Sequence, residues 1–117
     1  MPRRADRPVI EDMLSYAEES VAFLGERDGA ALGADRMRLL AVVRAVEIVG
    51  EAANTVSEAG RAAIDYDLRP AISMRHRVIH GYDSVSADIV AKTVREEFPN
   101  LIAALRLALA GPLPGDV

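Results

Sequence analysis

The sequence predicts an all-α protein, an antiparallel bundle of four to five helices. Half of the 117 residues are hydrophobic and only 4% are aromatic, so Ala, Val, Leu and Ile must build the core. A core with so few aromatic residues is more typical of packed helices than of a β-sandwich. The apolar residues also recur at intervals of three and four, which places them on one face of a helix. We expect a single domain over residues 1–117, with a core at about 8–110 and flexible ends.

Two helices are expected in the first half of the chain. The first covers residues 8–27, because a proline suits its first turn, and a Gly and Ala cluster at 25–33 breaks it. Asp35 is the expected N-cap of the longest helix, over residues 35–59, which Gly60 ends. The inward stripes contain Ile10, Leu14, Ala17, Val21 and Leu24 in the first helix, and Leu39, Val42, Val46, Val49, Ala53 and Val56 in the second.

Prolines and a serine divide the second half. A short helix is expected over 61–68, a third helix over 70–79, a serine-capped fourth helix over 86–98 and a last helix over 99–110, where a proline restarts it. The tail at 111–117 is expected to be frayed. The inward residues of the last two helices are Ile89, Val90, Val94, Leu101, Ile102, Leu105 and Leu109.

Composition excludes several functions. A net charge of −4 argues against a broad electrostatic grip on nucleic acid, so any RNA contact must be local. There is no cysteine and no metal-binding or phosphate-loop motif, and we expect neither a metal nor another cofactor. No apolar run approaches the roughly 20 residues of a membrane span. We therefore expect a cytoplasmic protein without a membrane partner.

The longest helix carries a polar stripe opposite its apolar face. Its spacing is again three and four residues, which is typical of a solvated helix face. This structural interpretation, with an ion pair between Arg44 and Glu47, is favoured over a functional one. The stripe consists of Arg44, Glu47, Glu51, Asn54 and Glu58.

The residues that can carry chemistry are concentrated between positions 74 and 82. Arg75, His76, His80 and Tyr82 lie there, and the two histidines are the only ones in the chain. Histidine can accept and donate a proton near neutral pH, and arginine is shaped to hold two phosphoryl oxygens. The group therefore suggests phosphodiester chemistry. On one helix Arg75 and His80 would be about 140° apart, so they converge only if Gly81 unwinds the last turn or a second copy supplies a partner.

The chain resembles the HepT-like toxins of the HEPN superfamily. The resemblance covers about residues 39–109 and rests on Arg75-x4-His80-x-Tyr82, the preceding Gly50-Glu51-Ala52 segment and the later Phe98-Pro99. Family members most often have asparagine directly after the arginine, where this chain has His76. We expect this difference to adjust the properties of the site and not to change the family that the chain resembles.

The resemblance implies a metal-independent endoribonuclease that works as a homodimer. In this interpretation His80 is the acid/base, Arg75 holds the scissile phosphate and His76 orients the substrate or supports His80. Glu51 would reach the motif helix and pair with Arg75. The resemblance also implies a toxin–antitoxin system, in which a nucleotidyltransferase antitoxin of the MNT type transfers AMP to Tyr82.

Plainer interpretations remain for single residues. His80 alone could interact with a helix dipole, and Tyr82 could be a packing residue. For Arg77 a structural role is favoured, either at the C-terminal end of its helix or in a pair with Glu51 or Glu58. A different class of function is a noncatalytic helical module that binds a nucleotide or docks a nucleotidyltransferase. The intact pair of Arg75 and His80 favours the enzyme, because a docking surface would not need both.

Overall fold

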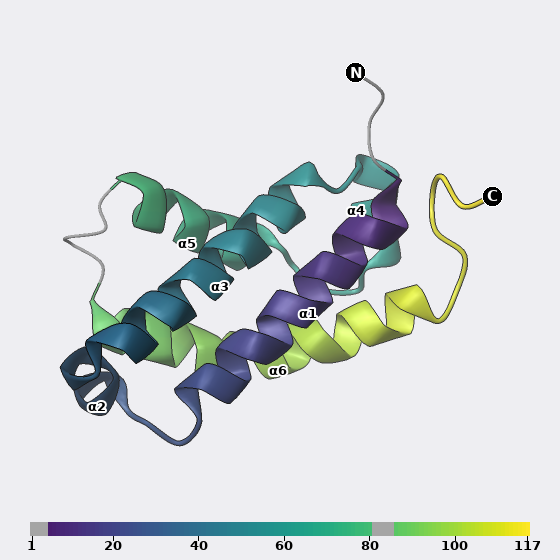
Figure 1. Ribbon diagram of the computed structural model, residues 1–117. Coiled ribbons are helices and arrows are strands. Elements are labelled where there is room, and N and C mark those ends of the chain that lie inside the picture. Colours follow the sequence, from purple (N-terminus) through teal and green to yellow (C-terminus); the bar gives the residue numbers. More distant parts are fainter. Residues whose placement is uncertain (1–4, 81–85) are drawn as a thin grey trace.

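The computed structural model describes residues 5–80 and 86–117, and the side chains of all of these except 78–80. Within this part the chain is helical and has no strand, which confirms the all-α prediction (Figure 1). None of the described helices is long and apolar enough to cross a membrane. The helices are α1 (Asp6–Leu24), α2 (Gly29–Ala34), α3 (Arg36–Thr55), α4 (Glu58–Ala63), α5 (Arg69–His80) and α6 (Ala87–Leu109).

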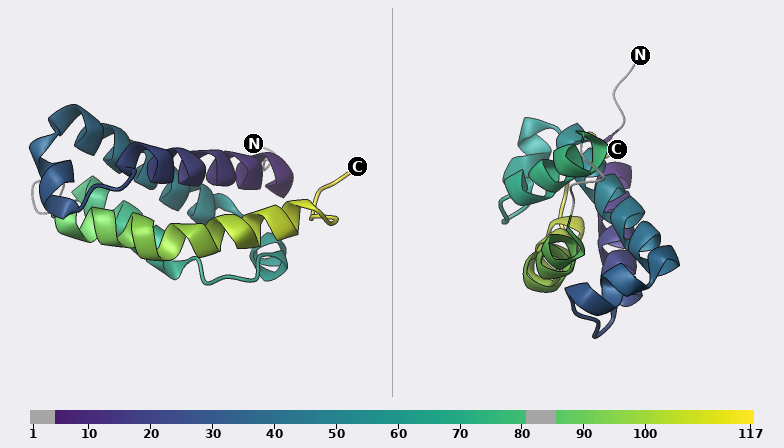
Figure 2. Two further views of the ribbon diagram at one scale, coloured as in Figure 1. Left: turned by 90° about the horizontal axis from the view of Figure 1, so that it is seen from below. Right: turned by 90° about the vertical axis from the view of Figure 1, so that its left-hand side faces the viewer.

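Helix α3 is the centre of the arrangement. α1 lies along α3 and also packs on α6, while α5 packs on α3 (Figure 1). The short helix α2 lies at one end of the bundle against α6. The views in Figure 2 show α4 at the other end, near the start of α1 and the C-terminal tail. The four long helices thus form the bundle and the two short helices close its ends.

The core is aliphatic, as the composition predicts. Phe98 is the largest fully buried side chain, and the other large ones are Ile, Leu, Met and Val. Most of the predicted inward residues are buried or packed against this core. Ile89 is an exception, because it is 37% exposed, while its neighbour Val90 is fully buried. The inward face of α6 therefore begins at Val90, and the prediction for Ile89 is wrong.

Side-chain caps fix the starts of four helices. Asp35 accepts a hydrogen bond from the backbone N–H of Arg38, and Ser86 accepts from Asp88 and Ile89, so both predicted caps are confirmed. Asp28 caps α2 in the same way, although a helix break was expected there. Gly29 brings this turn against α6, since a Cβ built on it would lie 1.8 Å from Oδ1 of Asp88.

The break after α3 comes earlier than expected. α3 ends at Thr55, and Ser57 caps α4 by accepting from the N–H of Gly60 at 3.0 Å. The buried carboxylate of Asp6 accepts from the Ser57 N–H at 3.0 Å and from its hydroxyl. Gly60 is therefore part of a buried junction between α1 and α4 and does not end the long helix.

Pro99 does not divide the last helix. α6 is continuous from Ala87 to Leu109 with the proline inside it. Pro99 is exposed, while Phe98 and Leu101 on either side of it are buried. Packing of both halves against the bundle outweighs the one backbone hydrogen bond that proline removes. The predicted restart at residue 99 is wrong for this reason.

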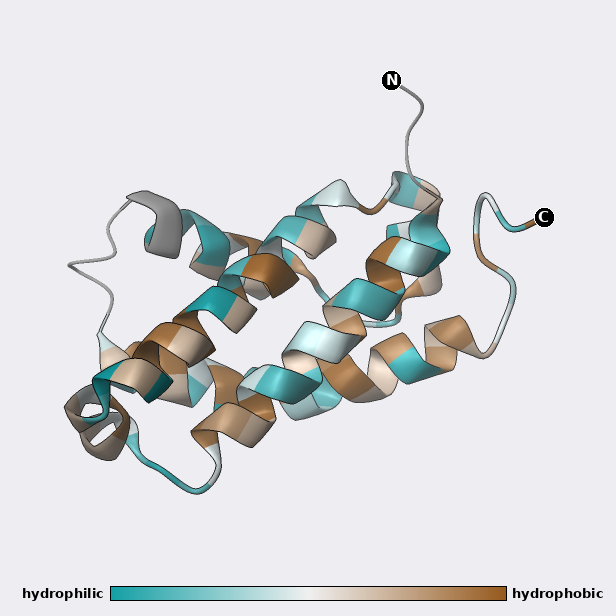
Figure 3. Cartoon of the chain, in the orientation of Figure 1, coloured by the Kyte–Doolittle hydropathy of each residue, from teal (hydrophilic) through white to brown (hydrophobic). Residues whose placement is uncertain are grey.

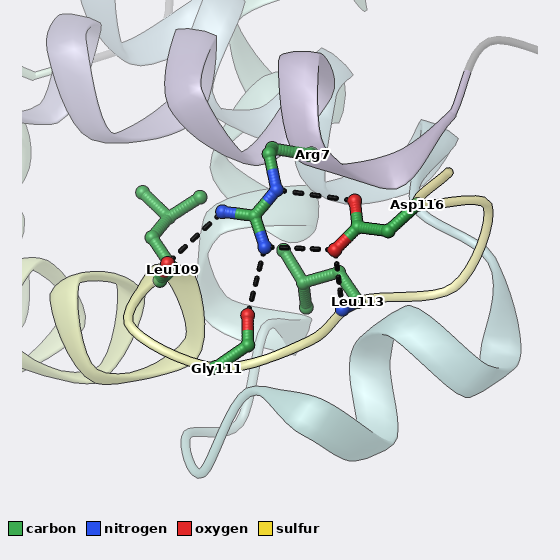
Figure 4. Close-up of polar contacts among 5 residues, drawn as sticks. All are labelled: Arg7, Leu109, Gly111, Leu113 and Asp116. Atoms are coloured by element: carbon green, nitrogen blue, oxygen red, sulfur yellow. Dashed lines mark hydrogen bonds and ion pairs between the residues drawn. The ribbon is translucent and has the colours of Figure 1, made fainter.

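The C-terminal tail is attached to α1 and is not frayed as expected. Arg7 donates to the carbonyl oxygens of Leu109 at 2.9 Å and Gly111 at 2.7 Å, and its guanidinium pairs with Asp116 (Figure 4). Asp116 also accepts from the N–H of Leu113 at 2.8 Å, and the Leu113 side chain is buried. One arginine thus holds both the end of α6 and the tail.

Candidate functional site

A glycine places the motif helix α5 on α3. A Cβ built on Gly50 would lie 2.4 Å from the Cβ of Arg75 and 2.6 Å from the carbonyl oxygen of Ala71. Any larger residue at this position would separate the two helices. The absence of a side chain at Gly50 therefore sets how closely Arg75 approaches the central helix.

Arg75 is the one residue in the described part with a buried polar side-chain atom that lacks a hydrogen-bond partner. That atom is its Nε, and the side chain as a whole is partly buried. Among the described residues, five other arginines make ion pairs with carboxylates. Burying a charged donor without an acceptor is costly, so such a group is a candidate for binding an anionic ligand.

The other predicted motif residues are placed only in part. His76 is exposed on α5, one residue from Arg75. The backbone of α5 remains helical through His80, whereas the His80 side chain and Tyr82 lie outside the described residues. Figure 3 shows hydrophilic residues on α5 before the grey segment begins.

Glu51 does not pair with Arg75 within the described residues. It is exposed and lines a groove of about 150 Å³ between α1 and α3, together with Val9, Asp12, Ile48, Ala52 and Thr55. Consecutive residues differ by about 100° around a helix, so Gly50 faces α5 while Glu51 faces the side of α1. The expected contact is therefore wrong, whereas the expected ion pair between Arg44 and Glu47 is present.

A second groove, between α5 and α6, did not figure in the sequence predictions. It has a volume of about 260 Å³, and polar side chains from both helices line it. At one side Tyr66 donates a hydrogen bond to the carboxylate of Glu97. Burial and this carboxylate raise the pKa of the Tyr66 phenol to about 12. The groove is lined by Pro70, Ser73, Met74, Arg77, Lys92, Thr93, Glu96 and Glu97.

The sequence signal for this groove was a row of residues on α5 that are spaced by three and four positions and therefore share one face of the helix. Pro70, Ser73 and Arg77 follow that spacing, but the sequence does not reveal which helix they face. Among the described side chains, which do not include those of residues 78–80, no three of His, Asp or Glu are grouped closely enough to hold a metal ion.

The structure defines the class as small all-α bundles, here with an Arg-x4-His sequence on α5 and no hydrogen-bond partner for the Arg75 Nε within the described residues. Within this class the chain belongs to the HepT-like ribonuclease family, whose model matches residues 13–108. It is therefore an enzyme that cleaves RNA.

Relatives in archaea support this assignment. A protein named "Probable ribonuclease HepT" from Thermococcus cleftensis is 30% identical over 100 residues, which cover 85% of this chain and 91% of the relative. A protein from Methanocaldococcus jannaschii, named provisionally as the RNase MJ0125, is 26% identical over 102 residues, covering 86% of this chain and 88% of the relative. No solved structure matches the chain significantly.

Proposed function

We propose that the protein is a metal-independent endoribonuclease toxin in which Arg75 and His80 form the catalytic pair. The observation that carries this proposal is the Arg75 guanidinium, whose buried Nε has no partner in the described part of the chain. An RNA phosphate would offset the cost of this partly buried cation, because a guanidinium donates to two phosphoryl oxygens at once.

The proposed reaction is an internal transfer at phosphorus. His80 takes the proton of the ribose 2′-hydroxyl, and the 2′-oxygen attacks the adjacent phosphorus. The bond to the 5′-oxygen breaks, and that oxygen leaves with the proton that His80 took up, giving a 2′,3′-cyclic phosphate and a 5′-hydroxyl. Arg75 stabilises the additional negative charge on the phosphorane, and acid and base catalysis each contribute about 10²–10⁴-fold. His76 orients the substrate from the exposed side of α5.

A homodimer would complete the site. α5 remains helical through His80, and positions 75 and 80 on one helix differ by about 140°. This supports pairing of Arg75 from one copy with His80 of the other over local unwinding. Met37 and Leu40 of α3 are 85% and 52% exposed, and a second copy could cover such apolar residues.

The proposed regulator is an MNT-type nucleotidyltransferase antitoxin acting in the cytoplasm. The phenol oxygen of Tyr82 would attack the α-phosphorus of ATP, so that AMP becomes attached and pyrophosphate leaves. The attached phosphate would compete with RNA for Arg75, since Tyr82 follows His80 by two residues. Intact-mass measurement after mixing both proteins with ATP tests this step, and an unmodified Tyr82 in that mixture contradicts it.

Cleavage itself is tested with the purified protein and RNA in EDTA. We expect cyclic-phosphate ends from the wild type and no cleavage from Arg75→Ala or His80→Ala, both folded by circular dichroism. Intact RNA after prolonged incubation of the unmodified wild type would favour the noncatalytic docking module instead.

Mixing the two inactive variants tests the shared site. If Arg75 and His80 act from different copies, each mixed dimer contains one intact site. An equal mixture should then recover about a quarter of the wild-type rate, since half of the dimers are mixed and each has one of two sites. A mixture as inactive as its components would place both residues of each site in one copy.

A further inference from the structure

The groove between α5 and α6 has charges of opposite sign at its two ends. Tyr66, which precedes α5, donates to Glu97, so Glu97 lies beside the start of α5. Arg77 lies in the last turn of α5, and Lys92 lies in the second turn of α6. Only six residues join these helices, so the basic end of the groove is the end nearest the Arg-x4-His motif.

The two cations at this end lack partners among the described residues. Arg77 and Lys92 are both exposed, and neither makes a hydrogen bond or an ion pair within the described part of the chain. The hydroxyl groups of Ser73 and Thr93 line the same groove and can donate further hydrogen bonds. At the other end the carboxylate of Glu97 is already bonded to Tyr66. The basic end can therefore accept an anion.

The helix geometry relates this basic end to Arg75. Around α5, His76 lies about 100° from Arg75, and Arg77 lies about 200° from Arg75. All three residues lie within about 3 Å along the helix axis. Arg75 lies at the contact with α3, and Arg77 lines the groove with α6. An RNA strand that contacts both Arg75 and Arg77 must cross the exposed side of α5, where His76 lies.

We propose that Arg77 and Lys92 hold an RNA backbone phosphate next to the phosphate that is cut. They are positioning residues, and the groove is a subsite for single-stranded RNA. This inference rests on the proposed function for the location of the cut, but the binding it describes can be measured without cleavage. Backbone contacts of this kind set register and carry no base specificity.

Binding is measured by fluorescence anisotropy with a labelled 2′-O-methyl RNA strand, which cannot be cleaved through its 2′-oxygen. The double variant Arg77→Gln/Lys92→Gln should bind about tenfold more weakly, and the slope of log affinity against log salt should become shallower by about 0.7, because one phosphate contact is lost. Arg106→Gln is the matched control, because it removes a cation on α6 that pairs with Glu18. Arg77→Lys/Lys92→Arg should restore most of the affinity.

Kinetics provide a second readout. For a long RNA the KM of the double glutamine variant should be about tenfold higher than that of the wild type, with little change in kcat. A dinucleotide that spans only the cut phosphate should be cleaved by this variant at the wild-type rate. Unchanged affinity and KM, or a loss equal to that of Arg106→Gln, would overturn the subsite. Loss of antitoxin binding with normal RNA affinity would also overturn it and make the groove a protein contact. Groove-dependent RNA binding by a protein that never cleaves RNA would support the subsite and refute the proposed reaction.

Discussion

Gly50 and Arg75 are in direct contact across the α3–α5 interface, where a Cβ on the glycine would lie 2.4 Å from the Cβ of the arginine. The carbonyl oxygen of Ala71 is at 2.6 Å from the same point, so backbone as well as side chain blocks any substituent. This glycine therefore determines the position of the motif helix, and the arginine proposed to hold phosphate is the residue it touches.

Gly50→Ala should destabilise the protein by about 1–3 kcal/mol, because the added methyl group must push α5 away from α3. RNA cleavage should fall as well, since Arg75 moves with α5. Urea unfolding and a cleavage assay measure the two effects. Gly111→Ala is the control, because nothing lies within 4 Å of a Cβ built there. Equal stability of the two variants would show that α5 adapts without cost.

Arg75→Met should leave the melting temperature unchanged or raise it. Its buried Nε has no hydrogen-bond partner within the described residues, so an apolar side chain of similar length removes a desolvation cost. Cleavage of RNA should fall by at least about 10²-fold because the charge on the phosphorane is no longer stabilised. Circular dichroism melting and cleavage rates check both parts. A large drop in melting temperature would mean that Arg75 is mainly structural.

Asp6→Ala should cost about 1–3 kcal/mol of unfolding free energy. Asp6 is 3% exposed and accepts from the backbone N–H and the hydroxyl of Ser57, so its removal leaves these partly buried donors without their partner. Urea unfolding measures the change, with Glu11→Ala as an exposed control on the same helix. A loss no larger than that of the control would argue against the α1–α4 junction as a source of stability.

The tail contact should depend on pH. Hydrogen bonding from Arg7 lowers the pKa of Asp116 below its ordinary value of 3.8. A lowered folded-state pKa stabilises the fold above the ordinary pKa, and this contribution is lost as the pH falls through the folded-state pKa. Asp116→Asn should therefore melt at a lower temperature than the wild type at neutral pH, and the gap should close between about pH 5 and about pH 2.

Differential melting across this range tests the tail contact. Asp65→Asn, a change of the same type at an exposed residue, should show no such closing gap. If the gap between wild type and Asp116→Asn stayed constant with pH, the contact with Arg7 would not depend on the charge of the carboxylate.

Short-range signals allowed part of this fold to be predicted. The N-caps at Asp35 and Ser86 depend on residues only two or three positions away, and both are present. Pro99 misled the prediction because its local effect is outweighed by burial of Phe98 and Leu101 on either side, which only the folded bundle provides. Packing of the residues on both sides outweighs the low helix propensity of a single residue.

The sequence suggested which residues belong to the candidate site, but it did not predict how they are arranged. The arrangement of Gly50 against Arg75 depends on the register of α3 and α5, whose contacting residues here are 25 positions apart, and a single sequence does not give that register. The same unknown explains the error for Glu51, which points to the α1 side, and the omission of the α5–α6 groove with Arg77 and Lys92.

The attachment of the tail by Arg7 has a consequence for the two chain ends. A Cβ built on Gly115 would lie 3.3 Å from the Cβ of Ala5, so the ends of the described chain touch. A few added residues could join them at little entropic expense. The chain could then be reopened between α1 and α2 to give a circular permutant that contains the same helices in a new order.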